Sequence, residues 1–192
     1  MPLVLASASP RRKALLAMLC PNFECLASNI DESIHANEVV LDYVLRMAIE
    51  KAQACPADDA VIVAADTSVV LDEQVLGKPV DTHHACKLLR RLSGRTHQVL
   101  TAVAVRRGQT LRSVTVVTEV DFVTLSDDLI ERYLQTDEPW DKAGAYGIQG
   151  FAGSFVRTIR GSYSAVVGLP LVETRELLAD FGLAPMWPTA HA

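Results

Sequence analysis

The sequence predicts an α/β fold in which a mixed β-sheet is flanked by helices. Two observations lead to this class: helical patterns separate the early strands, and two long β segments later in the chain are joined by the turn Arg107-Gly108-Gln109. The chain has 192 residues, of which 49% are hydrophobic and 21% are charged. A chain of this length and composition can bury a substantial core as one globular domain with one or two lobes.

In the first half of the chain, short apolar runs alternate with helical patterns. In order, we expect a strand at 2–6, a helix from Pro10, a strand at 23–27, a helix at 38–55, a buried strand at 61–65 and a short strand at 68–71. Ser9 is a suitable N-cap for the first helix, and Pro10 fits its first position because the φ of proline is already helical. Residues 61–65 form a continuous apolar run, which is typical of a strand buried on both faces.

The second half combines the long hairpin with further helices. In order, we expect a helix at 81–92, strands at 96–106 and 111–124, a helix capped by Ser126, β structure near 155–159 and 165–167, and a final helix opened by Pro170. We expect one domain over residues 1–184 and a frayed C-terminal tail at 185–192.

Composition argues against several classes of protein. The formal net charge is −5, which does not favour binding to a nucleic-acid polymer. No apolar run has the length needed to span a bilayer, and no basic region precedes the short apolar stretch at the N-terminus, so we expect neither a membrane span nor a signal peptide. The four cysteines form no CxxC pair, which fits a reducing cytoplasm.

The start of the first helix has an unusual charge. Arg11 and Arg12 fall in its first turn, where the peptide dipoles disfavour cations unless an anion joins them. With the hydroxyls of Ser7 and Ser9 and the free amides of the helix, they form a set that suits a phosphate. Arg12 also falls on the apolar stripe of the helix, so we expect it to point toward the body of the protein. The alternative is that both arginines extend into water.

Lys51 is a second anomaly, because it falls on the apolar stripe of the helix at 38–55. It lies seven residues after Val44 and four after Met47. Burying an ammonium without a partner is costly, so such a lysine indicates a nearby anion. The alternative is a lysine near a helix C-terminus, whose charge suits the dipole and whose stem extends to solvent.

Asp66 is a third anomaly, because it ends the apolar run at 61–65 and precedes Thr67. We expect its carboxylate at the tip of a core strand, where sites cluster in α/β sheets. A carboxylate there can hold a divalent ion and can orient or deprotonate a water. The alternative is a structural turn that begins at the aspartate.

Four further residues carry weaker signals. Asp31 and Glu32 are by default solvated loop acids, and Lys78 is by default a surface lysine in a turn. Gln149, in a glycine-rich stretch, offers the donor and acceptor that suit the edge of a base, but it can equally be a surface glutamine.

Together these segments resemble the Maf-like nucleotide pyrophosphatase family. The matching motifs are Ser7-Ala8-Ser9-Pro10-Arg11-Arg12, Glu50-Lys51-Ala52, Ala65-Asp66-Thr67, Gly77-Lys78-Pro79, Ser93-Gly94, Asp141-Lys142-Ala143-Gly144-Ala145-Tyr146-Gly147-Ile148-Gln149-Gly150 and Val166-Val167-Gly168-Leu169-Pro170-Leu171. They occur in order over nearly the whole chain, as far as about residue 183.

The resemblance implies an elongated α/β fold, with a strongly twisted sheet and two lobes around a central cleft, usually as a homodimer. It implies hydrolysis of a nucleoside triphosphate to the monophosphate and pyrophosphate, with Mg²⁺ or Mn²⁺. Asp66-Thr67 and the string at 146–149 look like the branch that acts on dTTP and UTP, rather than the branch that acts on 7-methyl-GTP. The implied biological role is the removal of non-standard pyrimidine nucleotides.

The resemblance also implies roles for the residues singled out above. The triphosphate is expected to lie on Ser7, Ser9, Arg11, Arg12, Lys51 and Lys78. Asp66 is the expected proton acceptor, with a metal ion that it shares with Glu32. Base preference is expected to depend on Arg12, Thr67 and Gln149.

Two rival functions stay open at this point. One is a nucleotide-binding regulator of cell division and septum formation that needs no catalysis. The other keeps the fold but prefers purine triphosphates such as ITP.

Overall fold

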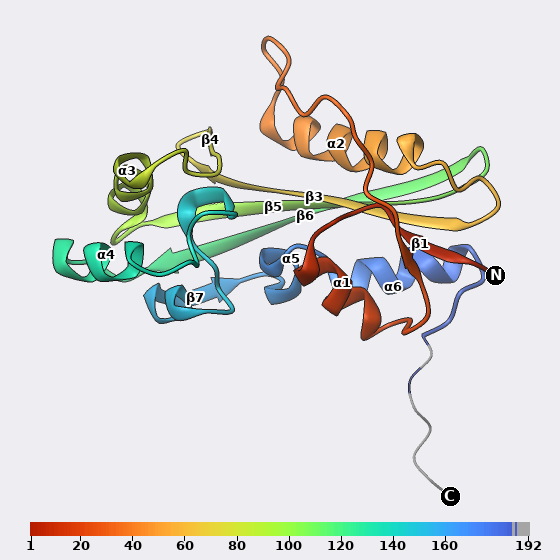
Figure 1. The fold of residues 1–192 in the computed structure, drawn as a ribbon. Helices are drawn as coiled ribbons and strands as arrows, with labels where there is room; N and C mark the ends of the chain where they lie inside the picture. Colours follow the sequence, from red (N-terminus) through yellow and green to blue (C-terminus); the bar gives the residue numbers. More distant parts are fainter. Residues whose placement is uncertain (186, 188–192) are drawn as a thin grey trace, which may run out of the picture. The chain divides into compact units, whose positions relative to one another are not determined.

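The computed structural model describes residues 1–185 and 187. Its elements in chain order are β1 (Leu3–Leu5), α1 (Pro10–Ala17), β2 (Glu24–Cys25), α2 (Val40–Ala54), β3 (Val61–Leu71), β4 (Gln74–Leu76), α3 (Thr82–Leu92), β5 (Thr96–Arg107), β6 (Thr110–Phe122), α4 (Asp127–Leu134), η1 (Ala143–Ala145), η2 (Phe151–Phe155), β7 (Val156–Arg160), α5 (Tyr163–Val167) and α6 (Leu171–Asp180). The mixed α/β class predicted from the sequence is confirmed (Figure 1).

The strands form one seven-stranded sheet with the order β2-β1-β3-β5-β6-β7, and β4 also pairs with β3. β1 pairs in parallel with both β2 and β3, and Leu3 lies opposite Val61. The pairs β3–β4 and β6–β7 are antiparallel. The sheet is therefore mixed. Helices α1 and α2 join its early strands, short turns join β3 to β4 and β5 to β6, and a long segment with α4, η1 and η2 leads from β6 to β7.

The chain divides into two compact units, and three long strands contribute residues to both. Unit 1 comprises Met1–Asp66, Thr101–Thr115 and Gly168–Ala192, and unit 2 comprises Thr67–Leu100 and Val116–Val167. The predicted central cleft stays a prediction. So does the tail at 185–192, most of which lies outside the described residues.

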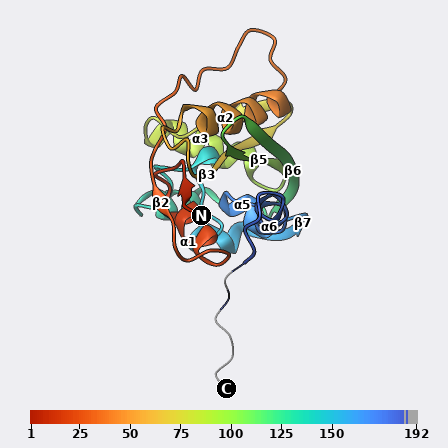
Figure 2. The same ribbon diagram turned by 90° about the vertical axis from the view of Figure 1, so that its right-hand side faces the viewer.

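Unit 1 is a three-layer arrangement. α2 covers one face of its part of the sheet, and α1 and α6 cover the other face (Figures 1 and 2). The strand residues between these helices are buried on both sides, as the apolar run of β3 predicted. Leu5, Leu16, Met47, Ile62 and Leu178 are among its most deeply buried side chains.

Unit 2 has its own hydrophobic core, built around α3, which contacts α4 and η1. Aromatic rings fill its centre. Phe122 packs edge-to-face against Tyr146, with ring centroids 4.9 Å apart, and Tyr133 packs in the same way against Phe155 at 5.0 Å. This core positions the segment that follows Tyr146.

Two sequence predictions about elements are wrong. The predicted strand at 165–167 is the end of helix α5, whose first turn is capped because the hydroxyl of Ser162 accepts a hydrogen bond from the N–H of Ala165 at 3.2 Å. The predicted strands at 61–65 and 68–71 are one strand, β3. A short apolar run alone does not distinguish a buried helix from a strand.

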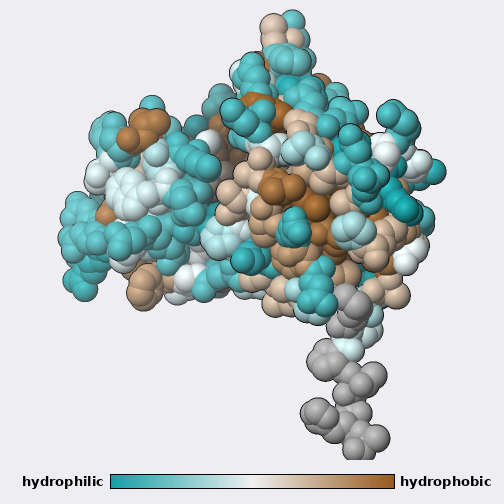
Figure 3. All heavy atoms as spheres, turned by 45° about the vertical axis from the view of Figure 1, so that its right-hand side comes forward, coloured by the Kyte–Doolittle hydropathy of each residue, from teal (hydrophilic) through white to brown (hydrophobic). Residues whose placement is uncertain are grey.

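The surface is mixed in character. Figure 3 shows a group of apolar side chains amid hydrophilic ones on one face, and the large apolar side chains that are exposed in unit 1 include Met18, Val39 and Trp187. Within the described part of the chain, no helix combines the length and the apolar character that crossing a membrane requires.

Candidate active site

The N-terminus of α1 is held by the two serines that precede it. The Ser9 hydroxyl accepts a hydrogen bond from the N–H of Arg12 at 3.4 Å, as the predicted N-cap requires. The Ser7 hydroxyl in turn accepts from the N–H of Ser9 at 3.1 Å. Pro10 occupies the start of the helix, and its first turn contains no acidic residue. The predicted cap is therefore confirmed, and the positive end of α1 carries two arginines.

Arg12 turns back toward the protein, as its position on the apolar stripe predicted. Its Nε donates to the backbone oxygen of Gly168 at 3.0 Å, and its Nη1 donates to the Ser7 hydroxyl at 3.4 Å. Burial lowers the pKa of Arg12, and the charge of Asp66 opposes this shift while that of Arg11 adds to it. The guanidinium therefore lies within electrostatic range of Asp66, among buried backbone and hydroxyl groups.

Lys51 is the centre of a cluster of charges in unit 1. Its side-chain nitrogen lies 2.7 Å from Oδ1 of Asp66 and 2.8 Å from Oε1 of Glu32. Lys51 is only 8% exposed, so the ammonium is largely removed from water and depends on these two carboxylates. The alternative of a lysine extended into solvent is wrong.

Helix α2 and strand β3 place the two halves of this ion pair. The buried face of α2 consists of Val44, Met47, Ala48, Lys51 and Ala52. The Ser28 hydroxyl donates to the backbone oxygen of Lys51 at 2.7 Å, which ties the preceding loop to the last turn of the helix.

Asp66 does not lie at a strand tip. It lies in the middle of the continuous strand β3 and is buried, so both the strand-tip prediction and the alternative of a structural turn are wrong. Successive side chains of a strand point to opposite faces, so Asp66 and Thr67 project in opposite directions. Lys51 supplies the counter-charge that lets a carboxylate occupy a central strand.

Seven of the predicted site residues belong to unit 1, namely Ser7, Ser9, Arg11, Arg12, Glu32, Lys51 and Asp66. The other three, Thr67, Lys78 and Gln149, belong to unit 2. Lys78 and Gln149 are both exposed, Lys78 between β4 and α3 and Gln149 between η1 and η2. Their predicted contacts with a substrate stay predictions.

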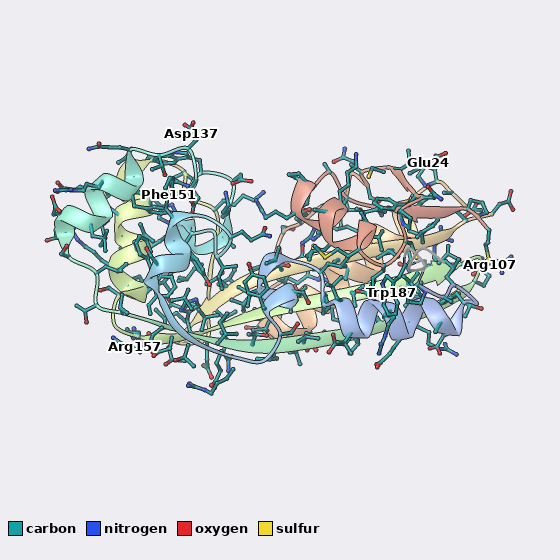
Figure 4. The ribbon with its side chains drawn as sticks, turned by 90° about the horizontal axis from the view of Figure 1, so that it is seen from below. Glu24, Arg107, Asp137, Phe151, Arg157 and Trp187 are labelled. Carbon is teal, nitrogen blue, oxygen red and sulfur yellow. The ribbon has the colours of Figure 1, made fainter. Side chains whose placement is uncertain are left out.

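The segment that carries Gln149 is fixed at both ends. Before it, the Tyr146 hydroxyl lies 2.8 Å from Nε2 of His97, and burial raises the pKa of the tyrosine. After it, the Glu138 carboxylate accepts from the N–H of Phe151 at 2.7 Å and from that of Ala152 at 3.1 Å. The side chain of Phe151, labelled in Figure 4, is nevertheless exposed. Gln149 therefore lies on a short loop whose ends are held.

Glu32 and Asp66 are the acidic groups that could take part in holding a metal ion. Among the residues that the structure describes, no group of three or more His, Cys, Asp or Glu side chains is placed to hold one. Glu32 and Asp66 both contact the ammonium of Lys51, so their carboxylates lie close together. This pair suits an ion such as Mg²⁺, which is often held by one or two carboxylates together with phosphate oxygens of a substrate.

Three residues support this site although no role is predicted for them from the sequence. The carbonyl of Gly168 accepts from Arg12, the Ser28 hydroxyl holds the end of α2, and the Tyr43 hydroxyl donates to the backbone oxygen of Glu32 at 3.0 Å. None of these roles has a local sequence signal, because each joins segments that the fold brings together.

A separate hollow of about 360 Å³ lies in unit 2 and is lined by the basic α3 side chains of His83, Lys87, Arg90 and Arg91. Arg90 is paired with Asp127 at 2.8 Å, and Arg91 donates to the side-chain oxygen of Gln74 at 2.9 Å. We assign this basic surface no ligand.

Two solved structures that match this chain are distantly similar to it. The match to the Ham1 protein of Staphylococcus aureus has a TM-score of 0.46 at 13% identity, and it covers 64% of this chain and 72% of the Ham1 chain. The match to a Ham1 protein of Coxiella burnetii has a TM-score of 0.44 at 16% identity, and it covers 64% of this chain and 73% of that Ham1 chain.

Sequence relatives are much closer. A dTTP/UTP pyrophosphatase of Escherichia coli (strain K12) is 54% identical over 182 residues, which are 93% of this chain and 92% of the relative. A nucleoside triphosphate pyrophosphatase of Shigella flexneri is 53% identical over the same shares of the two chains. The family model described as Maf-like protein matches residues 2–181. The chain therefore belongs to the Maf-like protein family.

Proposed function

We propose that this protein is a nucleoside triphosphate pyrophosphatase that hydrolyses dTTP and UTP to the monophosphate and pyrophosphate. The observation that carries the proposal is the buried contact of Lys51 with Asp66, in the same unit as the arginine-bearing N-terminus of α1. The names of the relatives at 53–54% identity support the same activity. Modified pyrimidine nucleotides fit the same chemistry, so a house-cleaning role in nucleotide metabolism follows from the proposal.

The phosphates are assigned to the cationic and hydroxyl groups around α1. Backbone amides at a helix N-terminus and guanidinium groups bind phosphate oxygens, and Ser7 and Ser9 already orient this turn. Arg11, Arg12 and Lys51 supply the positive charge in unit 1, and Lys78 is the phosphate ligand that we assign from unit 2. Binding of the triphosphate would offset the unfavourable placement of two arginines beside the helix dipole.

Asp66 is assigned as the proton acceptor for the attacking water. Lys51 bonds to Oδ1 of Asp66, and Oδ2 is the oxygen that we assign to the water. The water oxygen forms a bond to the α-phosphorus, the bond from that phosphorus to the bridging oxygen breaks, and the water proton passes to Asp66 while pyrophosphate leaves. Lys51 and the arginines stabilise the charge that spreads over the phosphate oxygens in this step.

A divalent cation, Mg²⁺ or Mn²⁺, is part of the proposal. Glu32 and Asp66 would hold it together with phosphate oxygens of the substrate, because carboxylate and phosphate oxygens are the ligands that such hard cations prefer. When bound, the ion would neutralise phosphate charge.

Base preference is assigned to Arg12, Thr67 and Gln149. Gln149 lies on a loop that is held by hydrogen bonds on both sides, and its side-chain amide offers a donor and an acceptor for a base edge. We also propose that the protein works in the cytoplasm, which its four free cysteines fit, and as a homodimer, as the family resemblance implies.

The deciding experiment is chromatography of the products after incubation with dTTP, UTP, CTP, ITP and 7-methyl-GTP and either metal. We expect monophosphate and pyrophosphate from dTTP and UTP, and a preference for ITP would refute the pyrimidine assignment. Asp66→Asn should lower kcat by about 10²–10⁴-fold, the usual contribution of a positioned base. Asp59→Asn, at an exposed aspartate of unit 1, is the matched control. Nucleotide binding without turnover in the unmodified protein would instead support a regulatory role.

A further inference from the structure

Glu32 lies on a segment that has no regular secondary structure, between β2 and α2. Its side chain is 58% exposed, yet its Oε1 lies 2.8 Å from the nitrogen of Lys51. An exposed carboxylate on an irregular segment loses its orientation readily, since its backbone and side chain are both free to rotate. Other groups must therefore hold the segment for Glu32 to meet Lys51.

One stripe of α2 supplies these groups. Tyr43, Arg46 and Glu50 are spaced three and four residues apart, so they lie along one side of the helix. The Tyr43 hydroxyl donates to the backbone oxygen of Glu32 at 3.0 Å. Its pKa is raised to about 12 by burial and by the charges of Asp66 and Glu32, so it remains a donor at neutral pH. This bond fixes the backbone of the residue whose side chain reaches Lys51.

Arg46 holds the next part of the segment. Its Nη2 donates to the backbone oxygen of Ser33 at 2.9 Å, directly after Glu32. The same guanidinium binds Glu38 with two bonds, of 2.6 Å from Nε and 2.7 Å from Nη2, and the pKa of Glu38 is lowered to about 2, mainly by this contact. Such a forked pair fixes direction as well as distance.

The two anchors also contact each other, because the guanidinium of Arg46 lies over the ring of Tyr43, 5.6 Å from its centroid. Glu38 additionally accepts from the N–H of His35 at 3.0 Å, which closes the segment onto itself. The side chains of Arg46 and Glu38 are 19% and 10% exposed, so this ion pair is partly shielded from water. All of these contacts hold the segment that presents Glu32, which points to the placement of that carboxylate.

We propose that Tyr43 and Arg46 are positioning residues that hold Glu32 on Lys51 and so set the geometry of the charge cluster with Asp66. They touch neither substrate nor metal in this proposal and act only through Glu32. The inference rests on the proposed function, in which Glu32 and Asp66 share a role at the reacting phosphate. Preorganisation by surrounding hydrogen bonds is the usual way to keep a functional carboxylate in its productive position.

The test is a double-mutant cycle on kcat with dTTP. Tyr43→Phe removes only the hydroxyl, and Arg46→Met removes the fork while keeping an unbranched side chain. Each should lower kcat by roughly ten- to hundredfold, the usual effect of losing a residue that orients a functional ligand, while KM changes little. The melting temperature should change little in Tyr43→Phe, whereas Arg46→Met should also lower it because the Glu38 carboxylate, 10% exposed, loses its counter-ion. In a Glu32→Gln background neither change should lower kcat further, because the group that they position is already lost.

Matched controls are Tyr163→Phe and Arg112→Met, at an exposed tyrosine and an exposed arginine elsewhere. Arg46→Lys should recover only part of the loss, because an ammonium cannot reproduce the fork. Hydrogen exchange of the amides at 31–36 gives a readout that needs no turnover, and we expect faster exchange in Arg46→Met than in Arg112→Met.

These experiments distinguish a failure of the positioning inference from a failure of the proposed function. If Glu32→Gln keeps normal kinetics, the assigned role of Glu32 fails and the inference fails with it. If Glu32→Gln lowers kcat but Tyr43→Phe and Arg46→Met do not, only the positioning inference fails. Losses that add fully to that of Glu32→Gln also overturn it, as does a loss of kcat in Tyr43→Phe that follows a fall in melting temperature.

Discussion

The side-chain nitrogen of Lys51 lies 2.7 Å from Oδ1 of Asp66, and each of these side chains is 11% exposed. The pair joins the last turn of α2 to the middle of β3, so the contact is structural as well as chemical. Each charge stabilises the other, because neither buried group is hydrated well enough to remain ionised without a counter-ion.

Lys51→Met should lower both activity and stability. It leaves the Asp66 carboxylate buried without its counter-ion, which should cost about 3–5 kcal/mol in the free energy of unfolding. Adding Asp66→Asn should recover much of that stability but none of the activity, since no buried charge is then left unpaired. Urea denaturation and turnover of dTTP check both effects, with Lys13→Met, at an exposed lysine of α1, as the control. A double variant as unstable as Lys51→Met would show that the pair is not the source of the cost.

Stability should depend on pH through His97. This side chain is 2% exposed, its Nδ1 has no partner among the described residues, and burial lowers its pKa to about 4. The unfolded chain takes up the proton near pH 6.5 and the folded chain only near pH 4. The contribution of His97 is therefore full above pH 6.5, and roughly 3 kcal/mol is lost as the pH falls from 6.5 to 4.

The comparison of His97→Gln with the unmodified protein isolates this effect from the carboxylates that titrate in the same range. In denaturant titrations at pH 7, 5.5 and 4, the free energy of unfolding of the variant should fall less steeply. His83→Gln, at an exposed histidine of α3, should keep the original slope. Equal slopes for all three proteins would contradict the prediction.

Gly150→Ala should destabilise unit 2 for reasons of space. The φ of Gly150 is negative, at −110°, but an added Cβ would overlap the carboxylate of Glu138. Glu138 must then move and release the N–H groups of Phe151 and Ala152. A buried donor that loses its partner lowers the free energy of unfolding by about 1–3 kcal/mol, and by less where water replaces the partner.

Thermal unfolding measures this cost. Gly77→Ala is the control, because an added Cβ there meets no atom within 4 Å. In a Glu138→Ala background, Gly150→Ala should cost little, since the obstacle is gone. If Gly150→Ala were equally destabilising in the Glu138→Ala background, the Glu138 carboxylate would not be the group that obstructs the added Cβ.

Arg106→Met should loosen the end of α2. The buried Arg106 donates to the backbone oxygens of Ala52 at 3.0 Å and Cys55 at 3.1 Å, which are among the carbonyls that a helix C-terminus leaves unpaired. Losing these bonds should cost about 1–3 kcal/mol. Chemical denaturation checks the value, with the exposed neighbour Arg107 (labelled in Figure 4) changed to Met as the control. Equal free energies of unfolding for the two variants would show that Arg106 does not stabilise the end of α2.

Local rules predicted much of this molecule. The cap at Ser9, the inward direction of Arg12 and the burial of Lys51 all follow from the 3.6-residue period of a helix and the preferences of its first turn. These features depend on neighbours in the sequence, so a single chain is enough to infer them.

Features that depend on distant segments were missed or wrong. The sequence predicts Asp66 at a strand tip because a charged residue ends the apolar run. The strand continues through this position, and Lys51, fifteen residues away, supplies the counter-charge of the buried carboxylate. The pairing of Glu32 with Lys51 depends on an irregular segment whose path is set by Tyr43 and Arg46. Arg106 had one available signal, a cation at the end of the apolar run of β5, but its acceptors lie about fifty residues earlier.

The order in which the chain is synthesised has a consequence for Arg12. Its hydrogen-bond partner Gly168 lies 156 positions later, in the last of the three segments that make up unit 1. A ribosome therefore adds every residue of unit 2 to the chain before it adds Gly168, whose carbonyl holds this guanidinium. The turn that carries Arg12 is among the first parts of the protein to be synthesised, and the carbonyl that holds this arginine is among the last.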